Sequence, residues 1–387
     1  MAVPPDLVSF VESSGLSAVP YGRDTQSALD AYRNLWTQAF QNFWHVRDLA
    51  RQWREVVGIV TSGYDDVSVS LSSLAERADV LVSGLVYEEL AANVAESQGI
   101  PFATLHFFPV RATGHLYPRV PPPILRSAMS ANEWLSWRMM KRFENTQRRS
   151  LRLPAAASPP PKRMADRGSL EIQAYDDVVF PGVAAEYAAS SNLRPLVGAL
   201  TMGLATPADD EVAAWIADGE PPIYFGFGST PVDSPDDVVA MIGDVCEQLG
   251  VRALICSGWN DFARCAPEHV KVVSAVNFGT VFPACRAVVH HGGAGTTAAA
   301  LRAGVPSLIL WTLPDQPVWA AQLKRMKVGA GRRFSRTTRD TLRADLQMVL
   351  QPEYVDCARR VATRMSSPAE SVGRAADLVE DLARNSR

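Results

Sequence analysis

The chain has 387 residues, of which 47% are hydrophobic and 20% charged, with a formal net charge of −3. This length favours two domains, and the near-neutral charge gives no general attraction to nucleic acid, so we expect no nucleic-acid partner. No apolar run reaches the roughly 18 residues that span a bilayer, no signal peptide is recognisable, and five cysteines without a CxxC pair predict reduced thiols in a cytosolic protein.

The first part of the chain predicts alternating strands and helices. Residues 2–3 fit the end of a strand, 4–15 a helix and 17–22 the next strand, so the chain begins within a strand–helix repeat and we expect further sequence upstream. Residues 25–78 predict helices with an aromatic stripe that fits a core. A strand at 78–84, a helix at 88–99 and a strand at 100–109 then favour a parallel, doubly wound sheet.

A basic helix follows a proline-rich loop at 117–125. It spans residues 131–152 and carries the basic residues Arg138, Lys141, Arg142, Arg148, Arg149 and Arg152. Two interpretations of this run stay open: a solvated face, or contact with an anionic membrane surface.

The second half predicts another α/β domain. Residues 169–182 and 194–200 fit the last strands of the first domain, and 201–222 fit the connection. Five strands and two helices follow, at 222–229, 234–249, 252–258, 270–276, 286–291, 296–303 and 306–311. We therefore expect domains at 1–200 and 201–365. A final helix at 366–387, with an apolar stripe of Val372, Ala376, Val379 and Leu382, is expected to dock on the first domain.

A glycine-rich turn at residues 291–298 carries the most specific chemical signal. Gly293, Gly295 and Ala298 match the G-x-G-x-x-A pattern of a dinucleotide fingerprint, with Asp315 about 20 residues on. Its late position, the two histidines before it and the Gln after Asp315 argue against that interpretation. In either case, glycines followed by a helix start suit an anion, because free N–H groups point at it.

The residues "VVHHGGAGTTAAALRAGVPSLILW", the later "DQP" and "PPIYFGFGS" resemble family 1 glycosyltransferases of the GT-B fold. The resemblance covers essentially the whole chain and is strongest to bacterial enzymes that glycosylate mycobacterial glycolipids and glycopeptide antibiotics, and to sterol glucosyltransferases. It implies two Rossmann-like α/β domains facing a cleft, and transfer of a hexose or deoxyhexose from a UDP- or dTDP-sugar to a hydroxyl of a lipid-like or other apolar acceptor.

The resemblance also implies a set of donor-binding residues. His291 matches the histidine that contacts the donor diphosphate, and Asp315 and Gln316 match the pair that binds the sugar hydroxyls. The loops that face the phosphates correspond to Gly228, Ser229, Gly293, Gly295, Thr296 and Thr297. The backbone contact to the nucleobase corresponds to Val276. Many relatives carry a glutamate for the ribose where this chain has Ala298 and Ala299, so the preference for uridine or deoxythymidine stays open.

No metal or cofactor is expected, because the chain has no Asp-x-Asp motif and the family holds the departing diphosphate with a helix dipole and side-chain donors. The family's catalytic base lies on a loop after the first strand of the N-terminal domain, a segment of about 30 residues that we expect upstream. His106, at a strand end, is a weak substitute candidate. The alternatives are a sugar-nucleotide-binding remnant without turnover and, less favoured, an NAD-dependent oxidoreductase.

Overall fold

The computed structural model describes residues 1–22, 24–25, 63–117, 120–190, 192–228, 232, 234–258, 262, 266–313 and 315–385. Most of the predicted aromatic helical segment, and Ser229, lie outside these residues. The chain divides into two compact units. Unit 1 comprises Met1–Asp177, Pro181–Val197 and Ala369–Arg387, and unit 2 comprises Val178–Phe180 and Gly198–Pro368. These limits lie close to the predicted ones at residues 200 and 365.

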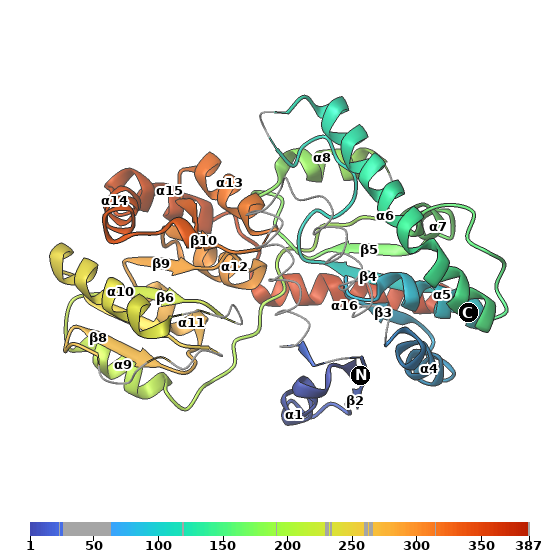
Figure 1. Ribbon diagram of the computed structural model, residues 1–387, viewed down its shortest axis with the longest axis horizontal. Helices are drawn as coiled ribbons and strands as arrows, with labels where there is room; N and C mark the ends of the chain where they lie inside the picture. The colour runs from blue at the N-terminus through green and yellow to red at the C-terminus, as the bar shows by residue number, and fades with distance from the viewer. Residues whose placement is uncertain are drawn as a thin grey trace. The chain divides into compact units, whose positions relative to one another are not determined.

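Unit 2 contains a six-stranded parallel sheet in the order β11-β10-β9-β6-β7-β8 (Figure 1). The strands are β6 (Ile223–Gly226), β7 (Ala253–Cys256), β8 (Val270–Val273), β9 (Ala287–His290), β10 (Ser307–Trp311) and β11 (Gly329–Arg333). The chain runs outward from β6 through β7 to β8, and then outward on the other side from β9 to β11. The strand order therefore reverses between β6 and β9, as in a doubly wound nucleotide-binding fold.

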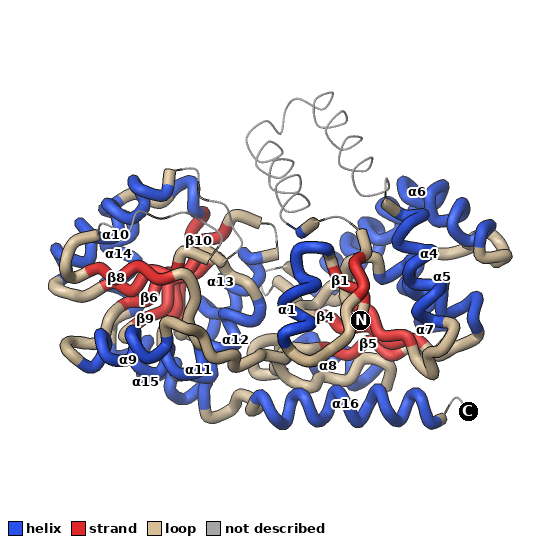
Figure 2. Tube along the Cα trace, turned by 90° about the horizontal axis from the view of Figure 1, so that it is seen from below, coloured by secondary structure: helices blue, strands red, loops and turns tan. Residues whose placement is uncertain are grey.

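Helices cover both faces of this sheet, as Figure 2 shows. Those on one face are α10 (Pro235–Leu249) and α14 (Arg339–Val349); those on the other are α9 (Asp209–Ala217), α11 (Phe278–Val281) and α12 (Ala294–Ala303). Helices α13 (Gln316–Met326) and α15 (Pro352–Ala362) also belong to unit 2. Neighbouring strand residues alternate between the two cores: Phe225 packs into the first and Tyr224 into the second. Burial on both faces explains the continuous apolar runs in these strands.

Unit 1 contains two parallel sheets, β1-β2 and β3-β4-β5. Its strands are β1 (Ala2–Val3), β2 (Val19–Pro20), β3 (Leu81–Ser83), β4 (Phe102–His106) and β5 (Leu170–Gln173). Its helices within the described residues are α1 (Val8–Ser13), α4 (Tyr64–Ala75), α5 (Glu88–Gln98), α6 (Pro122–Ser150), α7 (Pro160–Asp166), α8 (Pro181–Ser190) and α16 (Pro368–Arg384). Apolar residues of α4 and α5 form its core with Phe102. The predicted α/β alternation is confirmed in both units.

Three sequence predictions are corrected. The basic helix α6 begins at Pro122 rather than residue 131, because prolines fit the first turn of a helix, where no N–H is needed. Residues 194–200 form only an isolated bridge, Gln173 to Leu196, instead of a strand. In α16 the buried residues are Ser371 and Ala375, whereas Val372 of the predicted stripe is 51% exposed.

Within the described ranges, no helix combines the length and the apolar character needed to cross a membrane. Cys246, Cys256, Cys285 and Cys357 are buried free thiols. Burial raises the pKa of both Cys246 and Cys285 to about 12, so these two thiols are protonated and unreactive at neutral pH.

Candidate functional site

The glycine-rich turn lies where the strand order of unit 2 reverses. In the parallel pairing of β6 with β9, Gly226 stands opposite His290. Both strands end at this pair, so the loop that carries Gly228 and the loop that carries His291 leave the same edge of the sheet side by side. Ligands of open α/β sheets bind in the crevice at such a reversal, outside the carboxyl ends of the strands.

The imidazole of His291 fills the space between these two loops. A Cβ on Gly228 would stand 2.8 Å from His291 Cε1, and a Cβ on Gly293 would stand 2.6 Å from His291 Nε2. Gly228 also has a φ of +57°, in the left-handed region that favours glycine. The structure therefore brings together three predicted site residues, and it explains why two of them are glycines.

Helix α12 begins directly after this turn and leaves backbone donors free. Its N-cap residue Gly293 supplies no side-chain cap, and the N–H groups of Ala294, Gly295 and Thr296 precede the first donor that a helical carbonyl can reach. Thr297 was predicted to face the phosphates. In the structure its N–H and its hydroxyl both donate to the Gly293 carbonyl, at 3.0 and 2.8 Å. Thr297 thus fixes the turn, and the three preceding N–H groups face outward.

The two histidines have separate roles. The Nδ1 atom of His290 accepts the Gly292 N–H at 3.1 Å, so this fully buried ring holds the turn in place. Burial lowers the pKa of His290 to about 3, with a smaller contribution from His291. Burial also lowers the pKa of His291 to about 4, and the Gly226 backbone opposes part of that shift. Both rings are therefore neutral near pH 7, and His291 would meet an anion as an N–H donor.

Asp315 and Gln316 follow the carboxyl end of β10, the strand next to β9, and begin helix α13. A Cβ on Gly292 would stand 3.0 Å from the Cβ of Gln316, so Gln316 lies beside the turn. The Oε1 atom of Gln316 accepts the N–H groups of Thr312 and Leu313, at 2.7 and 2.9 Å. A sugar hydroxyl would therefore meet Nε2. Burial raises the pKa of the Asp315 carboxyl.

A cavity of about 570 Å³ lies along α12, beside the predicted phosphate turn. Its wall includes Gly295, Thr296, Ala299 and Arg302 from α12 together with residues 200–203, Phe278 and Gly279. The spacing of the α12 residues could have predicted this part of the wall, because positions 295, 299 and 302 share one face of a helix. The side chain of Val276 packs in the core, which leaves its predicted backbone contact to the nucleobase a prediction; the neighbouring Phe278 and Gly279 line the cavity.

Arg302 also anchors the chain at the end of this cavity. Its guanidinium donates to the Ala199 carbonyl, the Thr201 hydroxyl and the Ser366 carbonyl, each at 2.7 Å. Sequence reasoning did not single it out, since an arginine in the last turn of a helix commonly serves that helix alone.

His106, the weak candidate for a catalytic base, belongs to a buried polar network of unit 1. The ring is fully buried, its Nε2 lies 2.7 Å from Glu88 Oε1, and its Nδ1 lies 3.3 Å from the Gln173 amide. Arg111 joins Glu88 to Glu171 in the same network. A base must reach the hydroxyl that it deprotonates. His106 is corrected to a structural residue, because both of its nitrogens are occupied and none of its surface is exposed.

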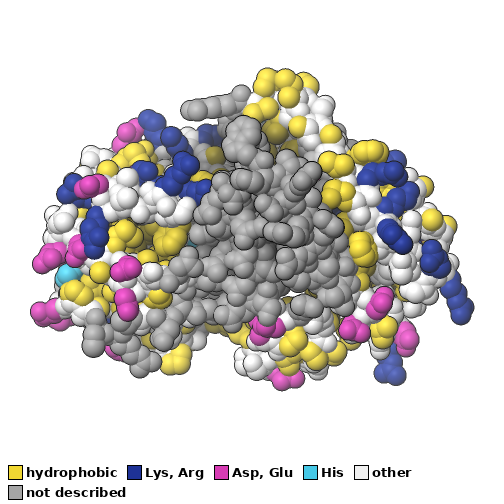
Figure 3. Space-filling view, in the orientation of Figure 1, with side chains coloured by type: hydrophobic (Ala, Val, Ile, Leu, Met, Phe, Trp, Pro, Cys, Tyr) yellow, Lys and Arg dark blue, Asp and Glu magenta, His cyan; other side chains and the backbone are white. Residues whose placement is uncertain are grey.

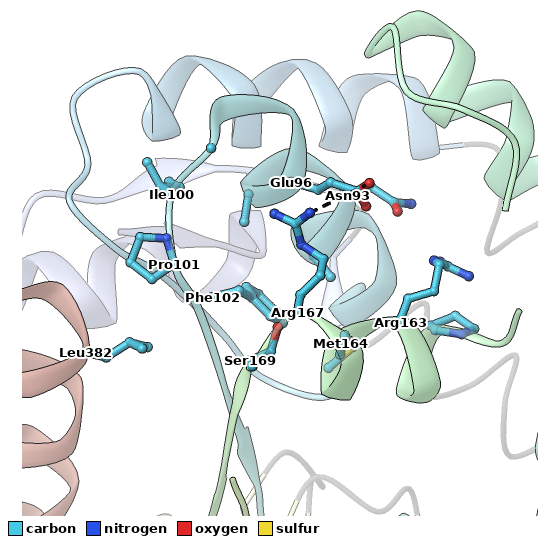
Figure 4. Close-up of a pocket in the computed structure, with 15 residues that line it drawn as sticks. Asn93, Glu96, Ile100, Pro101, Phe102, Arg163, Met164, Arg167, Ser169 and Leu382 are labelled. Carbon is cyan, nitrogen blue, oxygen red and sulfur yellow. Dashed lines mark ion pairs between the residues drawn. The ribbon is translucent and has the colours of Figure 1, made fainter. Parts of the chain in front are cut away.

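A second cavity, of about 260 Å³, lies at the amino edge of the β3-β4-β5 sheet and is drawn in Figure 4. Its charged side chains pair with one another: Arg167 lies 3.9 Å from Glu96, and Glu96 also pairs with Arg148 at 2.8 Å. Arg163 is paired with Glu144. Each charged side chain named here therefore already has an ion-pair partner within unit 1.

Comparison with known proteins gives consistent similarities. Residues 252–380 match the family model described as erythromycin biosynthesis protein CIII-like, C-terminal domain. An uncharacterized glycosyltransferase of Mycobacterium tuberculosis is 56% identical, covering 100% of this chain and 92% of that protein. The vancomycin aglycone glucosyltransferase of Amycolatopsis orientalis is 26% identical, covering 96% and 88%. The crystal structure of glycosyltransferase VinC in complex with dTDP matches with a TM-score of 0.63 at 17% identity, covering 99% and 92%.

Replacing His290 by Asn should reduce the loss of stability in acid. The unfolded histidine has a pKa near 6.5 and the folded one about 3, so only the unfolded chain gains the proton between these values. The free energy of unfolding then falls by about 2 kcal/mol between about pH 6.5 and pH 5 because of this group. Asn can still accept the Gly292 N–H. Urea unfolding near pH 7.5 and pH 5 measures the difference, and an equal fall in both proteins would contradict the assignment.

Proposed function

Because this chain belongs to the family 1 glycosyltransferases of the GT-B fold, we propose that it transfers a hexose or deoxyhexose from a UDP- or dTDP-sugar to a hydroxyl group of a lipid-like or other apolar acceptor. The family, fold and enzyme class predicted from sequence are confirmed by these similarities. They leave the oxidoreductase alternative without support, since the glycine-rich turn lies within residues 252–380, which match the erythromycin biosynthesis protein CIII-like family model.

One observation carries the donor half of this proposal: the neutral His291 ring and three free N–H groups of α12 converge at the reversal of strand order. As the sugar leaves, negative charge develops on the diphosphate. Preorganised N–H donors and the positive end of a helix stabilise such charge without a metal ion. Within the described part of the chain, no group of three or more His, Cys, Asp or Glu side chains could hold a metal ion.

The reaction that we propose inverts the anomeric carbon. The acceptor oxygen forms its bond to the sugar on the face opposite the diphosphate, the bond to the diphosphate breaks, and the acceptor proton leaves to a base. Asp315 and the Gln316 amide lie beside the turn, where they would orient the sugar hydroxyls. We do not propose His106 as that base, because both of its ring nitrogens have partners within the buried network of unit 1.

An apolar acceptor is supported by exposed aromatic side chains after the carboxyl end of β4. Phe107 and Tyr117 are both more than one-third exposed there. The name of the relative from Amycolatopsis orientalis gives the vancomycin aglycone as its acceptor.

We infer a cytosolic location, which the buried free thiols support. We also infer peripheral attachment at the inner face of the membrane.

Replacing His291 by Ala should weaken binding of UDP and dTDP by roughly 10- to 100-fold, because one hydrogen bond to a charged group is lost. Gly293→Ala should have a similar effect, since its Cβ would displace the same ring. Isothermal titration calorimetry measures both. His115→Ala, a change in unit 1 at a half-exposed side chain, is the matched control. Unchanged nucleotide binding in both variants, or binding of NAD in place of the nucleotides, would refute the site.

Replacing Ala299 by Glu should raise the affinity for UDP relative to dTDP by roughly five-fold, equivalent to about one net hydrogen bond. Ala299 lines the cavity beside the phosphate turn, and the family places a ribose-binding glutamate in this part of the helix. A carboxylate there could accept from both ribose hydroxyls of UDP but from only one of dTDP. Calorimetry with both nucleotides gives the ratio; Ala298→Glu, at a buried neighbour, should instead impair folding.

Transfer itself is tested with UDP- and dTDP-sugars and hydroxylated acyl lipids or lipopeptides as acceptors. We expect a product with inverted anomeric configuration by NMR, and an unchanged rate with EDTA, because the charge on the diphosphate is met by N–H donors. Retention of configuration or loss of the rate with EDTA would contradict the mechanism. Tight nucleotide binding with no product from any acceptor would support the binding remnant instead.

A further inference from the structure

Helix α6 turns its acidic residues inward and its basic residues outward. Its two acidic side chains both have partners within unit 1: Glu133 accepts the Ala112 N–H, and Glu144 pairs with Arg163 and accepts the Trp137 indole N–H. Of the basic side chains of the run, Arg148 is buried and paired with Glu96. The outer face of the helix therefore carries positive charge that no acid of the same helix offsets.

Four basic residues share this outer face. Arg138, Lys141, Arg142 and Arg149 line a shallow, open groove of about 550 Å³ together with Asn145 and Thr146. None of these four makes an ion pair with another residue in the described ranges; Arg138 and Lys141 instead lie over the rings of Trp134 and Trp137. Figure 3 shows Lys and Arg side chains gathered along the outer side of α6. The groove is therefore open to an anionic ligand.

Large apolar side chains continue the same face toward the start of the helix. Trp134 is 53% exposed, and the other exposed large apolar residues of α6 are Ile124, Leu135, Met139 and Phe143. Ile124, Leu135, Arg138, Arg142 and Arg149 are separated by three-, four-, seven- or eleven-residue steps, which place them along one side of a helix. Exposed tryptophan and leucine beside arginine are typical of helices that lie in a membrane interface.

We propose that this face of α6, defined by Ile124, Trp134, Leu135, Met139, Arg138, Lys141, Arg142 and Arg149, binds the surface of an anionic phospholipid bilayer. The basic half meets lipid phosphates, and the apolar half enters the boundary between headgroups and acyl chains. A soluble acidic polymer would match the charge alone and would leave the exposed apolar half in water. Membrane contact uses residues of unit 1 that take no part in the donor site, so it stands or fails independently of glycosyl transfer.

The test is cosedimentation of the full chain with vesicles of phosphatidylcholine, with and without about one-third phosphatidylglycerol. Each basic residue near an anionic surface contributes on the order of five-fold to the partition coefficient. The triple variant Arg138→Gln, Lys141→Gln, Arg142→Gln should therefore bind anionic vesicles roughly 100-fold more weakly than the wild type. Trp134→Ser with Leu135→Ser should also weaken binding, and this second variant separates membrane insertion from charge alone.

The matched control removes the same charge from unit 2 by replacing Arg336, Arg339 and Arg343 with Gln, and it should bind vesicles like the wild type. Circular dichroism and the midpoint of thermal unfolding of the full chain, compared with the wild type, show whether each variant is folded. Equal binding of the α6 triple variant and the control, or equal binding to neutral and anionic vesicles, would overturn the proposal. So would binding to heparin without binding to vesicles, which would assign the face to a soluble polyanion.

Discussion

The parallel pairing of β6 with β9 is the constraint on which the proposed donor site depends. It sets Gly226 opposite His290, so the loops that follow both strands must leave the sheet at neighbouring points. The His291 ring fits between them only because residues 228 and 293 have no side chain. Helix α12 then begins with its free N–H groups at the same place. The register of this one strand pair therefore brings the His291 ring and the start of α12 to the same point of the sheet edge.

The two adjacent histidines are both neutral because they are buried, but they have different roles. His290 is enclosed on all sides and accepts a backbone N–H, which keeps the turn closed. His291 is also neutral, but it stands at the edge where an anion would arrive. An imidazole that is neutral before the ligand binds carries no strongly held counterion, so the ligand does not have to displace one. The low pKa of each ring is therefore compatible with tight anion binding, because an approaching anion favours the neutral tautomer whose N–H faces it.

Much of this site could be predicted from residue patterns, because strand–turn–helix transitions leave strong local signals. The glycines, His291 and the start of α12 followed from the sequence between residues 287 and 304, within two residues of the helix start found. What failed depended on contacts between distant residues. Three such contacts could not be predicted without knowledge of the partners. The Thr297 hydroxyl donates to the Gly293 carbonyl, and Gln316 Oε1 accepts backbone N–H groups. Both nitrogens of His106 are occupied by Glu88 and Gln173. The displaced stripe of α16 failed for the same reason, since pattern alone does not say which side meets the protein.

The position of Arg302 has a consequence for how the enzyme can evolve. One turn of helix before it, Ala299 lines the cavity and also packs partly against the core that contains Tyr224. Arg302 is bound to Ala199, Thr201 and Ser366, which belong to the two segments where the chain enters and leaves unit 2. Replacement of Arg302 in evolution would therefore release both chain segments at once, whereas a change at Ala299 would affect the cavity wall and one core contact.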